Sequence, residues 1–327
     1  MLDTVFYFLL NMSLASCFVI AALLLVRLIR PLPRRIVYPL WALAFFRLVT
    51  PFTLPTGWSL FNFTGGLVKR LITVEMAVQS GTPAPTTTPL PVQAPGQGQG
   101  SLWAMNMIGA AEQYAPIEYK TESLRQVFQT ASMTWAVVAA AALAAAFILY
   151  ALTRKELAQA VRIKEGLYRS DLLLSPMLAG LFRQRIIIPA SLDPDSAEGR
   201  MVLAHEHVHK RRLDNLWRLL AICIACAHWF NPLAWVMLKS FFADMEQSCD
   251  EAVIKKYNAE ERKAYAGALL RFAEGKRASV SAAFGHSGVK LRIVNVLNYK
   301  RLTLAGVAAS SAFLLIVALV LITNPQG

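Results

Sequence analysis

Long apolar stretches without a charged residue are the feature that most restricts how this chain can fold. Residues 5–26 and 133–152 contain no Asp, Glu, Lys or Arg, and each is long enough to cross the hydrocarbon core of a bilayer as one helix. Only 16% of the 327 residues are charged and 56% are hydrophobic, whereas soluble domains are roughly 25% charged. We therefore predict a mainly α-helical integral membrane protein with several spans.

Basic residues beside the apolar stretches predict the orientation in the membrane. Arg27 and Arg34 follow the first stretch and Arg154 follows the second, and Lys and Arg collect on cytoplasmic flanks. This pattern places the N-terminus outside a bacterial plasma membrane. We predict two transmembrane helices in residues 1–54, the second at 36–54, a third at 133–152 and a fourth at 302–322. An extracytoplasmic loop is predicted at 55–132, with a disordered linker rich in Pro, Thr, Gly and Gln at 80–100. A cytoplasmic domain with a small β-sheet is predicted at 153–301.

The pentapeptide His205-Glu206-His207-Val208-His209 is the main chemical signal in the predicted cytoplasmic domain. Its flanks contain no helix breaker, so we predict a helix over 195–212. On a helix, residues four apart lie on the same face, which lets His205 and His209 direct two imidazoles at one metal ion. Glu206 is adjacent and could act on a water molecule at that ion.

A second pair of residues four apart supplies a third ligand. Glu246 and Asp250 also lie on a predicted helix. Two histidines and one glutamate form a known catalytic zinc set, so we predict Zn²⁺ bound by His205, His209 and Glu246. Asp250 is placed to accept the free N–H of a ligating histidine. The alternative is a solvated acidic helix face, which the apolar neighbourhood of both carboxylates disfavours.

The stretch 219–238 is also apolar and long enough to cross the membrane. A crossing would put Glu246 on the opposite side from the two histidines, and Pro232 would interrupt the helix. We therefore predict a membrane-associated helical hairpin that breaks near Asn231. For His228 and Asn231 the structural role, with both satisfied by neighbouring backbone, is favoured over a role in the metal site.

Residues 185–189 are predicted to form a β-strand because Ile186, Ile187 and Ile188 are β-branched. Pro189 cannot donate to a ladder, which predicts an edge strand. A substrate could then add as a further strand beside these isoleucines and present its backbone to the metal.

Several short motifs, taken in order, resemble those of peptidase family M56, the membrane metalloproteases that include β-lactam receptors. They are Pro33-Arg34-Arg35, Ser175-Pro176, Ile186-Ile187-Ile188-Pro189, the His205–His209 pentapeptide, His228-Trp229-Phe230-Asn231-Pro232-Leu233 and Glu246-x-x-Cys249-Asp250-Glu251. The resemblance implies a gluzincin-like zinc endopeptidase in which Glu206 is catalytic. In those receptors a penicillin-binding domain follows the last span and drives cleavage of a cytoplasmic DNA-binding repressor. The residues up to Gly327 hold no such domain, so we do not expect β-lactam sensing from this sequence.

A fainter likeness links His286 and Arg292 to a histidine and an arginine that follow the zinc site in M48 proteases. That likeness implies active-site neighbours. A basic face beside lipid headgroups also explains both residues and is the favoured interpretation.

The predicted function is a membrane zinc endopeptidase that cleaves a cytoplasmic protein, such as a transcriptional repressor, in transmembrane signalling. Two alternatives stay open: an M48-like quality-control or prenyl-type protease, and a non-catalytic receptor, against which the intact Glu206 argues. The expected partners are a protein substrate and the lipid bilayer. The net charge of +13 is assigned to cytoplasmic loops rather than to nucleic-acid binding. A homodimer is neither predicted nor excluded.

Overall fold

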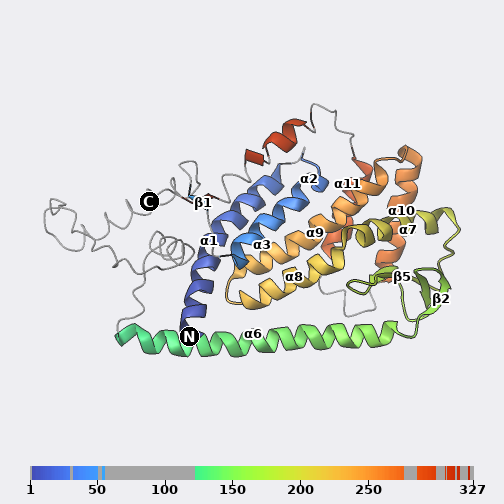
Figure 1. Cartoon of the computed structure of the whole chain (residues 1–327). Coiled ribbons are helices and arrows are strands. Elements are labelled where there is room, and N and C mark those ends of the chain that lie inside the picture. The colour runs from blue at the N-terminus through green and yellow to red at the C-terminus, as the bar shows by residue number, and fades with distance from the viewer. Residues whose placement is uncertain are drawn as a thin grey trace. The chain divides into compact units, whose positions relative to one another are not determined.

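The computed structural model is mainly helical, and its described residues also form a four-stranded sheet and one two-stranded pairing (Figure 1). The structure describes residues 2–29, 32–50, 54–55, 122–275, 286–299, 306, 308–313, 315–316 and 323–324. The predicted linker at 80–100, most of the loop at 55–132 and much of the span at 302–322 lie outside these residues. Two compact units are present, one of residues 1–19, 42–135 and 312–327, the other of residues 20–41 and 136–311.

Two helices are long and apolar enough to cross a membrane, within the part of the chain that the structure describes. They are α1 (Leu2–Leu28) and residues Gln126–Leu157 of α6 (Glu122–Leu157). Both were predicted from the sequence as apolar helices. Helix α6 begins earlier than the predicted span at Met133, and its first residues belong to the predicted loop.

The predicted second span at 36–54 is interrupted. In its place are α2 (Arg34–Val37), the 3-10 helix η1 (Tyr38–Leu40) and α3 (Trp41–Val49). Pro39 lies within η1, and a proline has no backbone N–H to continue an α-helical ladder. The helical run is thus shorter and less regular than predicted, and a membrane crossing there stays a prediction.

The first unit is held by aromatic contacts near the start of α1. The Phe6 ring lies 6.3 Å from that of Phe128 and 6.0 Å from that of Trp135, between ring centroids. In the same unit, β1 (Leu54–Pro55) pairs in parallel with β6 (Thr323–Asn324).

The second unit contains a sheet with the strand order β2-β3-β5-β4. The strands are β2 (Val161–Lys164), β3 (Leu167–Ser170), β4 (Met177–Ala179) and β5 (Arg185–Pro189). Strand β5 pairs in parallel with β3 and antiparallel with β4.

The prediction that Ile186, Ile187 and Ile188 form an edge strand for substrate was wrong. These residues lie in the interior strand and are at most 2% exposed. Proline is tolerated because β4 pairs only with residues 185–187, so Pro189 lies beyond the end of β4. Its missing N–H therefore costs no hydrogen bond on that side.

The helix with the histidine motif, α7 (Ala197–Arg212), begins at a side-chain cap. Ser196 Oγ accepts a hydrogen bond from the Gly199 backbone N–H at 2.9 Å, which satisfies one of the free donors of the first turn. The helix ends at Leu213, whose left-handed backbone (φ 56°) turns the chain directly into α8 (Asp214–Ala227).

The predicted hairpin around 219–238 is present as two helices joined by a short turn. Helix α8 ends at Ala227 and α9 (Pro232–Ile254) begins after Asn231, whose side chain accepts from the Leu233 backbone N–H at 2.9 Å. Asn231 is thus satisfied locally, as favoured from the sequence. Helix α9 then runs along α8 to reach α7 (Figure 1).

Two apolar clusters fix α7 and α9. Val202 of α7 packs against buried sheet residues that include Ile186 and Ile188. Ile254 of α9 packs with residues of α10 (Ala259–Gly275) and α11 (His286–Leu297). Burial of apolar side chains therefore holds α7 against the sheet and α9 against α10 and α11.

Candidate metal centre

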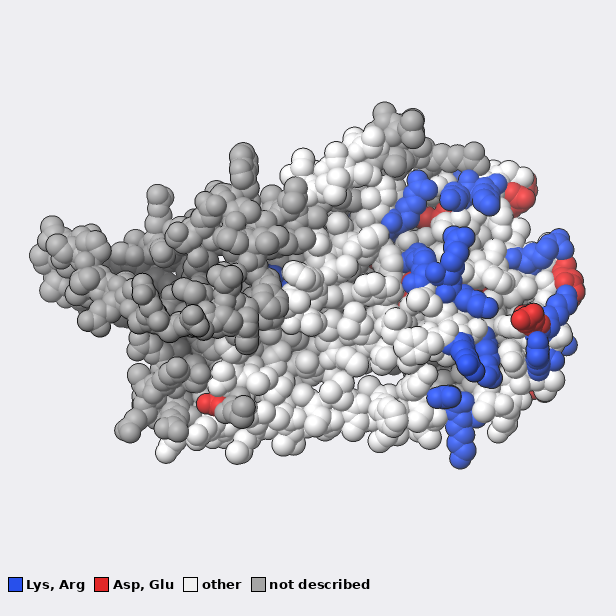
Figure 2. All heavy atoms as spheres, viewed as in Figure 1, with Lys and Arg blue, Asp and Glu red and all other residues white. Residues whose placement is uncertain are grey.

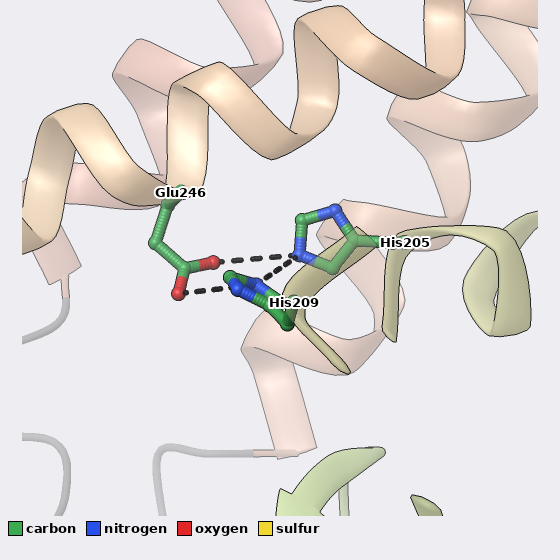
Figure 3. Close-up of side chains that lie close together, drawn as sticks. All are labelled: His205, His209 and Glu246. Atoms are coloured by element: carbon green, nitrogen blue, oxygen red, sulfur yellow. Dashed lines mark hydrogen bonds and ion pairs between the residues drawn. The ribbon is translucent and has the colours of Figure 1, made fainter. Parts of the chain in front are cut away.

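The two predicted histidine ligands meet on the buried face of α7. His205 Nε2 lies 3.0 Å from His209 Nε2, and both residues are buried. Figure 3 shows the two imidazoles side by side, with their ring nitrogens directed toward Glu246. The spacing of one helical turn produces this arrangement.

Glu246 of α9 completes a group of three metal-ligand atoms. Its Oε2 lies 3.5 Å from His205 Nε2 and its Oε1 lies 3.7 Å from His209 Nε2. All three ligand atoms lie within 4.8 Å of one another. Tetrahedral zinc with bonds of about 2.0–2.1 Å needs ligand atoms about 3.4 Å apart. The donor types and their separations therefore fit a zinc ion.

Asp250 serves the His205 side of the centre. Its Oδ1 lies 3.1 Å from His205 Nδ1, and it accepts a hydrogen bond from the Tyr265 hydroxyl at 2.7 Å. Arg292 of α11 donates to both carboxylate oxygens, at 2.7 and 2.8 Å. The Arg292 guanidinium also lies 3.0 Å from Glu246 Oε2, so one partly buried cation bridges the Asp250 and Glu246 carboxylates.

Asp214, at the start of α8, serves the His209 side. Its Oδ2 lies 2.7 Å from His209 Nδ1. Its Oδ1 accepts from the Tyr38 hydroxyl at 3.1 Å and lies 3.3 Å from Arg212 Nε. Cys249 Sγ is 3.4 Å from both His209 Nδ1 and Asp214 Oδ2.

The charges of the centre shift several pKa values. Burial opposes ionisation of Glu246 and Asp250, but the Arg292 charge and the contacts with the histidines together outweigh it, holding the pKa of Glu246 well below its usual range and that of Asp250 at about 2. Burial also opposes protonation of His209. The Glu246 charge and the hydrogen bond to Asp214 overcome this effect and raise the pKa of His209. Burial raises the pKa of Cys249 to about 11. The carboxylates are therefore ionised and the thiol is neutral near pH 7.

The structure brings most of the predicted site residues together. Glu206 lies on α7 between the two histidines and is 8% exposed. Arg292 enters the centre, as the fainter likeness implied. His286 is the first residue of α11, and its side chain lies outside the described part of the chain. His228 is 1% exposed at the α8–α9 turn, and its ring lies 6.1 Å from that of Phe230, between centroids.

Sequence reasoning missed Asp214, Tyr38, Tyr265, Arg212 and Arg218. Arg218 Nη2 lies 2.5 Å from Glu246 Oε1. Asp214 had a usable signal, because it is the first carboxylate after the histidine motif. Tyr38 had none, since it precedes Asp214 by 176 residues.

Comparisons with known proteins identify the family of the chain. The family model of the BlaR1 peptidase M56 matches residues 7–296. The regulatory protein BlaR1 of Bacillus licheniformis is 32% identical over 170 residues, which cover 49% of this chain and 28% of that protein. The methicillin resistance mecR1 proteins of Staphylococcus aureus and Staphylococcus epidermidis are each 26% identical over 99 residues, 30% of this chain and 17% of theirs.

The chain thus aligns with less than a third of the length of these relatives. The family match is much broader, because residues 7–296 take in nearly all of α1, the four-stranded sheet and the helices that carry His205, His209 and Glu246. The chain belongs to the BlaR1-type peptidase family M56.

Proposed function

We propose that this protein is a membrane zinc endopeptidase that cleaves a cytoplasmic protein during transmembrane signalling. One observation carries the proposal: the ligand atoms of His205, His209 and Glu246 converge from two helices beside the buried Glu206. Family membership implies metallopeptidase activity in general. The names of the relatives, a regulatory protein and methicillin resistance proteins, support a regulatory role. A repressor as substrate follows from the resemblance to family M56.

The residues of the proposed centre have three roles: metal binding, proton transfer and orientation of the histidines. His205, His209 and Glu246 would hold Zn²⁺, which when bound supplies Lewis acidity and makes a water molecule easier to deprotonate. Glu206 takes the proton from the attacking water and delivers it to the leaving amine. Asp250 and Asp214 accept the Nδ1–H groups of the two histidines, which leaves each Nε2 free for the metal.

Exposed apolar residues support a membrane location for the α8–α9 hairpin. Trp217, Leu220 and Trp235 are 38–45% exposed on its surface. Figure 2 shows Lys and Arg gathered over the end of the second unit that carries the sheet, α7 and α10, whereas the surface over α8 is drawn without charge. A hairpin at the cytoplasmic leaflet with the basic end in the cytoplasm fits this distribution.

Replacing the proposed base tests catalysis separately from metal binding. Glu206→Gln should retain zinc but lose cleavage of a quenched fluorescent peptide library, because an amide cannot accept the proton. Glu198→Gln is a matched control, since Glu198 lies on α7 but pairs with Arg271 away from the centre. Cleavage by Glu206→Gln at the wild-type rate would refute the assignment. Wild-type protein that binds zinc but cleaves nothing would favour the non-catalytic receptor.

The proposed topology has its own test. Single cysteines at Gly98, Glu165 and Asn258, in a cysteine-free background, would be treated from outside intact cells with an impermeant thiol reagent. We expect labelling only at position 98. Labelling at 258 without labelling at 165 would show that the α8–α9 segment crosses the membrane, contrary to the proposal.

A further inference from the structure

The segment that follows α1 contacts the helices of the metal centre at several buried points. Asp244 of α9 is 0% exposed, and it accepts from Arg27 Nε at 2.8 Å and from Trp41 Nε1 at 2.9 Å. Glu251, also on α9, accepts the backbone N–H groups of Arg34 and Arg35 at 2.8 and 3.0 Å. The described residues of 27–41, here called the juxtamembrane segment, are therefore fixed to α9.

These contacts use the side of α9 away from the metal. Asp244 and Glu251 are seven residues apart and share one face of the helix, whereas Glu246 and Asp250 lie on the other. Helix α9 thus lies between the juxtamembrane segment and the histidines of α7. At the junction of α7 and α8, however, the segment reaches past α9 to the centre itself.

Tyr38 makes that contact. Its hydroxyl donates to Asp214 Oδ1 at 3.1 Å, and Asp214 Oδ2 accepts the Nδ1–H of His209 at 2.7 Å. The Tyr38 ring stacks on Phe241 of α9, with centroids 5.4 Å apart, and the Arg212 guanidinium lies 4.2 Å from the ring centroid on a face of Tyr38. The ring is therefore held in place, and its hydroxyl has a fixed direction.

Tyr38 and Tyr265 play matching parts on the two sides of the centre. Each tyrosine donates to the aspartate that contacts one histidine, Asp214 for His209 and Asp250 for His205. Asp214 is fully buried, so without the Tyr38 hydroxyl its Oδ1 would keep the longer contact with Arg212 Nε at 3.3 Å and lose a hydrogen bond that water cannot readily replace. The Tyr38 hydroxyl therefore fixes the orientation of Asp214.

We propose that Tyr38 is a positioning residue of the metal centre, which orients His209 through Asp214 and thereby makes the juxtamembrane segment part of that centre. This proposal rests on the proposed zinc site and extends it to regulation. Because Tyr38 follows α1 by one short segment, a displacement of that apolar helix reaches a metal ligand through two hydrogen bonds.

Zinc affinity of purified full-length protein, measured by competition with a chelating dye, tests the proposal. Tyr38→Phe removes the hydroxyl but keeps the ring between Phe241 and Arg212. We expect it to weaken zinc binding about tenfold, the lower end of the effect of losing an outer partner of a metal ligand. Tyr257→Phe is a matched control, because Tyr257 packs in the apolar cluster of α9, α10 and α11 instead.

Two further readouts separate positioning from a merely structural role. Thermal unfolding of the metal-free protein should show, for Tyr38→Phe, no more than the small loss expected for one hydrogen bond, whereas the visible absorption spectrum of the Co²⁺-substituted protein should shift. In an Asp214→Asn background, Tyr38→Phe should cause little additional loss of zinc affinity, because both residues act through the same contact.

The outcomes are distinguishable. Wild-type protein that binds no zinc would refute the metal centre itself. Wild-type protein that binds zinc, with Tyr38→Phe binding it equally well or with losses that add in the double variant, would refute only the role of Tyr38. A Tyr38→Phe protein that fails to fold would also overturn the proposal, because its role would then be structural.

Discussion

The two histidines of the centre have partners of the same kind but of different origin. On each side, an imidazole Nδ1 faces a buried aspartate that also meets one tyrosine and one arginine. On the His205 side all partners come from α9, α10 and α11, downstream of the motif. On the His209 side, the tyrosine comes from the juxtamembrane segment, before the motif.

The arginines of the two sides also differ. Arg292 donates to both oxygens of Asp250 and reaches Glu246, whereas Arg212 approaches Asp214 at 3.3 Å and also donates to Ser248. The His205 side is therefore a closed group of strong charged contacts. The His209 side depends more on a neutral donor, and that donor comes from the segment that follows the apolar helix α1. A displacement of α1 would therefore reach His209 before His205.

The largest expected effect is that of Asp250→Ala. This change leaves the partly buried Arg292 with Glu246 as its remaining carboxylate, and breaking one partner out of a buried ion pair costs about 3–5 kcal/mol, an upper bound for this pair. Asp214→Ala should cost less, because Arg212 is more exposed than Arg292, 23% against 14% for the side chains, and keeps its contact with Ser248.

Thermal unfolding of metal-free protein would measure this difference between the two sides. Asp195→Ala serves as a control, since the Asp195–Lys164 pair is exposed and such pairs contribute about 0–1 kcal/mol. Equal losses in Asp250→Ala and Asp214→Ala would show that the two sides do not differ as their arginines suggest.

The same contrast explains what the sequence could predict. Asp250 was predictable because it lies one turn after Glu246 on one helix. For Asp214 the sequence offered its place as the first carboxylate after the motif, but its contact with His209 was not predictable, since the left-handed backbone of Leu213 redirects the chain in a way that helical periodicity does not describe. Tyr38 meets Asp214 only through the tertiary fold.

Local rules also failed at the sheet. Pro189 indicated an edge strand, but β4 is too short to reach it, so the proline sits in an interior strand without losing a bond. The helices α1, α6 and α7 and the hairpin break were predictable from apolar length and breaker residues, because burial and backbone chemistry act locally there. Strand order and the partners of Asp214 were not, because they depend on contacts between distant segments.

Gly199→Ala should lower the stability of α7, the helix that carries both His205 and His209. A Cβ at this position would collide with the Asp193 carbonyl oxygen and lie 2.9 Å from the Pro194 carbonyl carbon, so the first turn of α7 must shift. We expect a loss of about 1–3 kcal/mol, as for other overpacked sites. Gly267→Ala on α10 is the matched control, because its Cβ would meet no atom within 4 Å and alanine favours a helix. A stable Gly199→Ala protein would mean that α7 is not anchored at its first turn.

Tyr265→Phe removes from the His205 side the same atom that Tyr38→Phe removes from the His209 side. The Tyr265 hydroxyl is buried between Asp250 and His205, so we expect a stability loss of about 1 kcal/mol for one net hydrogen bond. Zinc affinity should fall less than in Tyr38→Phe, because Arg292 continues to hold both Asp250 oxygens. A larger fall in zinc affinity for Tyr265→Phe than for Tyr38→Phe would show that zinc binding depends more on the tyrosine of the His205 side, contrary to the proposal.

The smallest expected effect is that of Cys249→Ser. His209, Asp214 and Cys249 form a second group with metal-ligand atoms within 4.8 Å of one another. The Cys249 thiol could therefore bind the ion together with His209 and Asp214 in place of His205 and Glu246. Two contacts argue against it: His209 Nδ1 is already hydrogen-bonded to Asp214, and Asp214 already meets Tyr38 and Arg212.

A soft thiolate would bind zinc strongly if it took part, so removal of the Cys249 thiol would lower the zinc affinity measurably. We expect Cys249→Ser to bind zinc with the wild-type stoichiometry and affinity within about twofold, a difference of about 0.4 kcal/mol. Loss of zinc in Cys249→Ser, with zinc retained in Glu246→Ala, would show that the ion is bound by His209, Asp214 and Cys249.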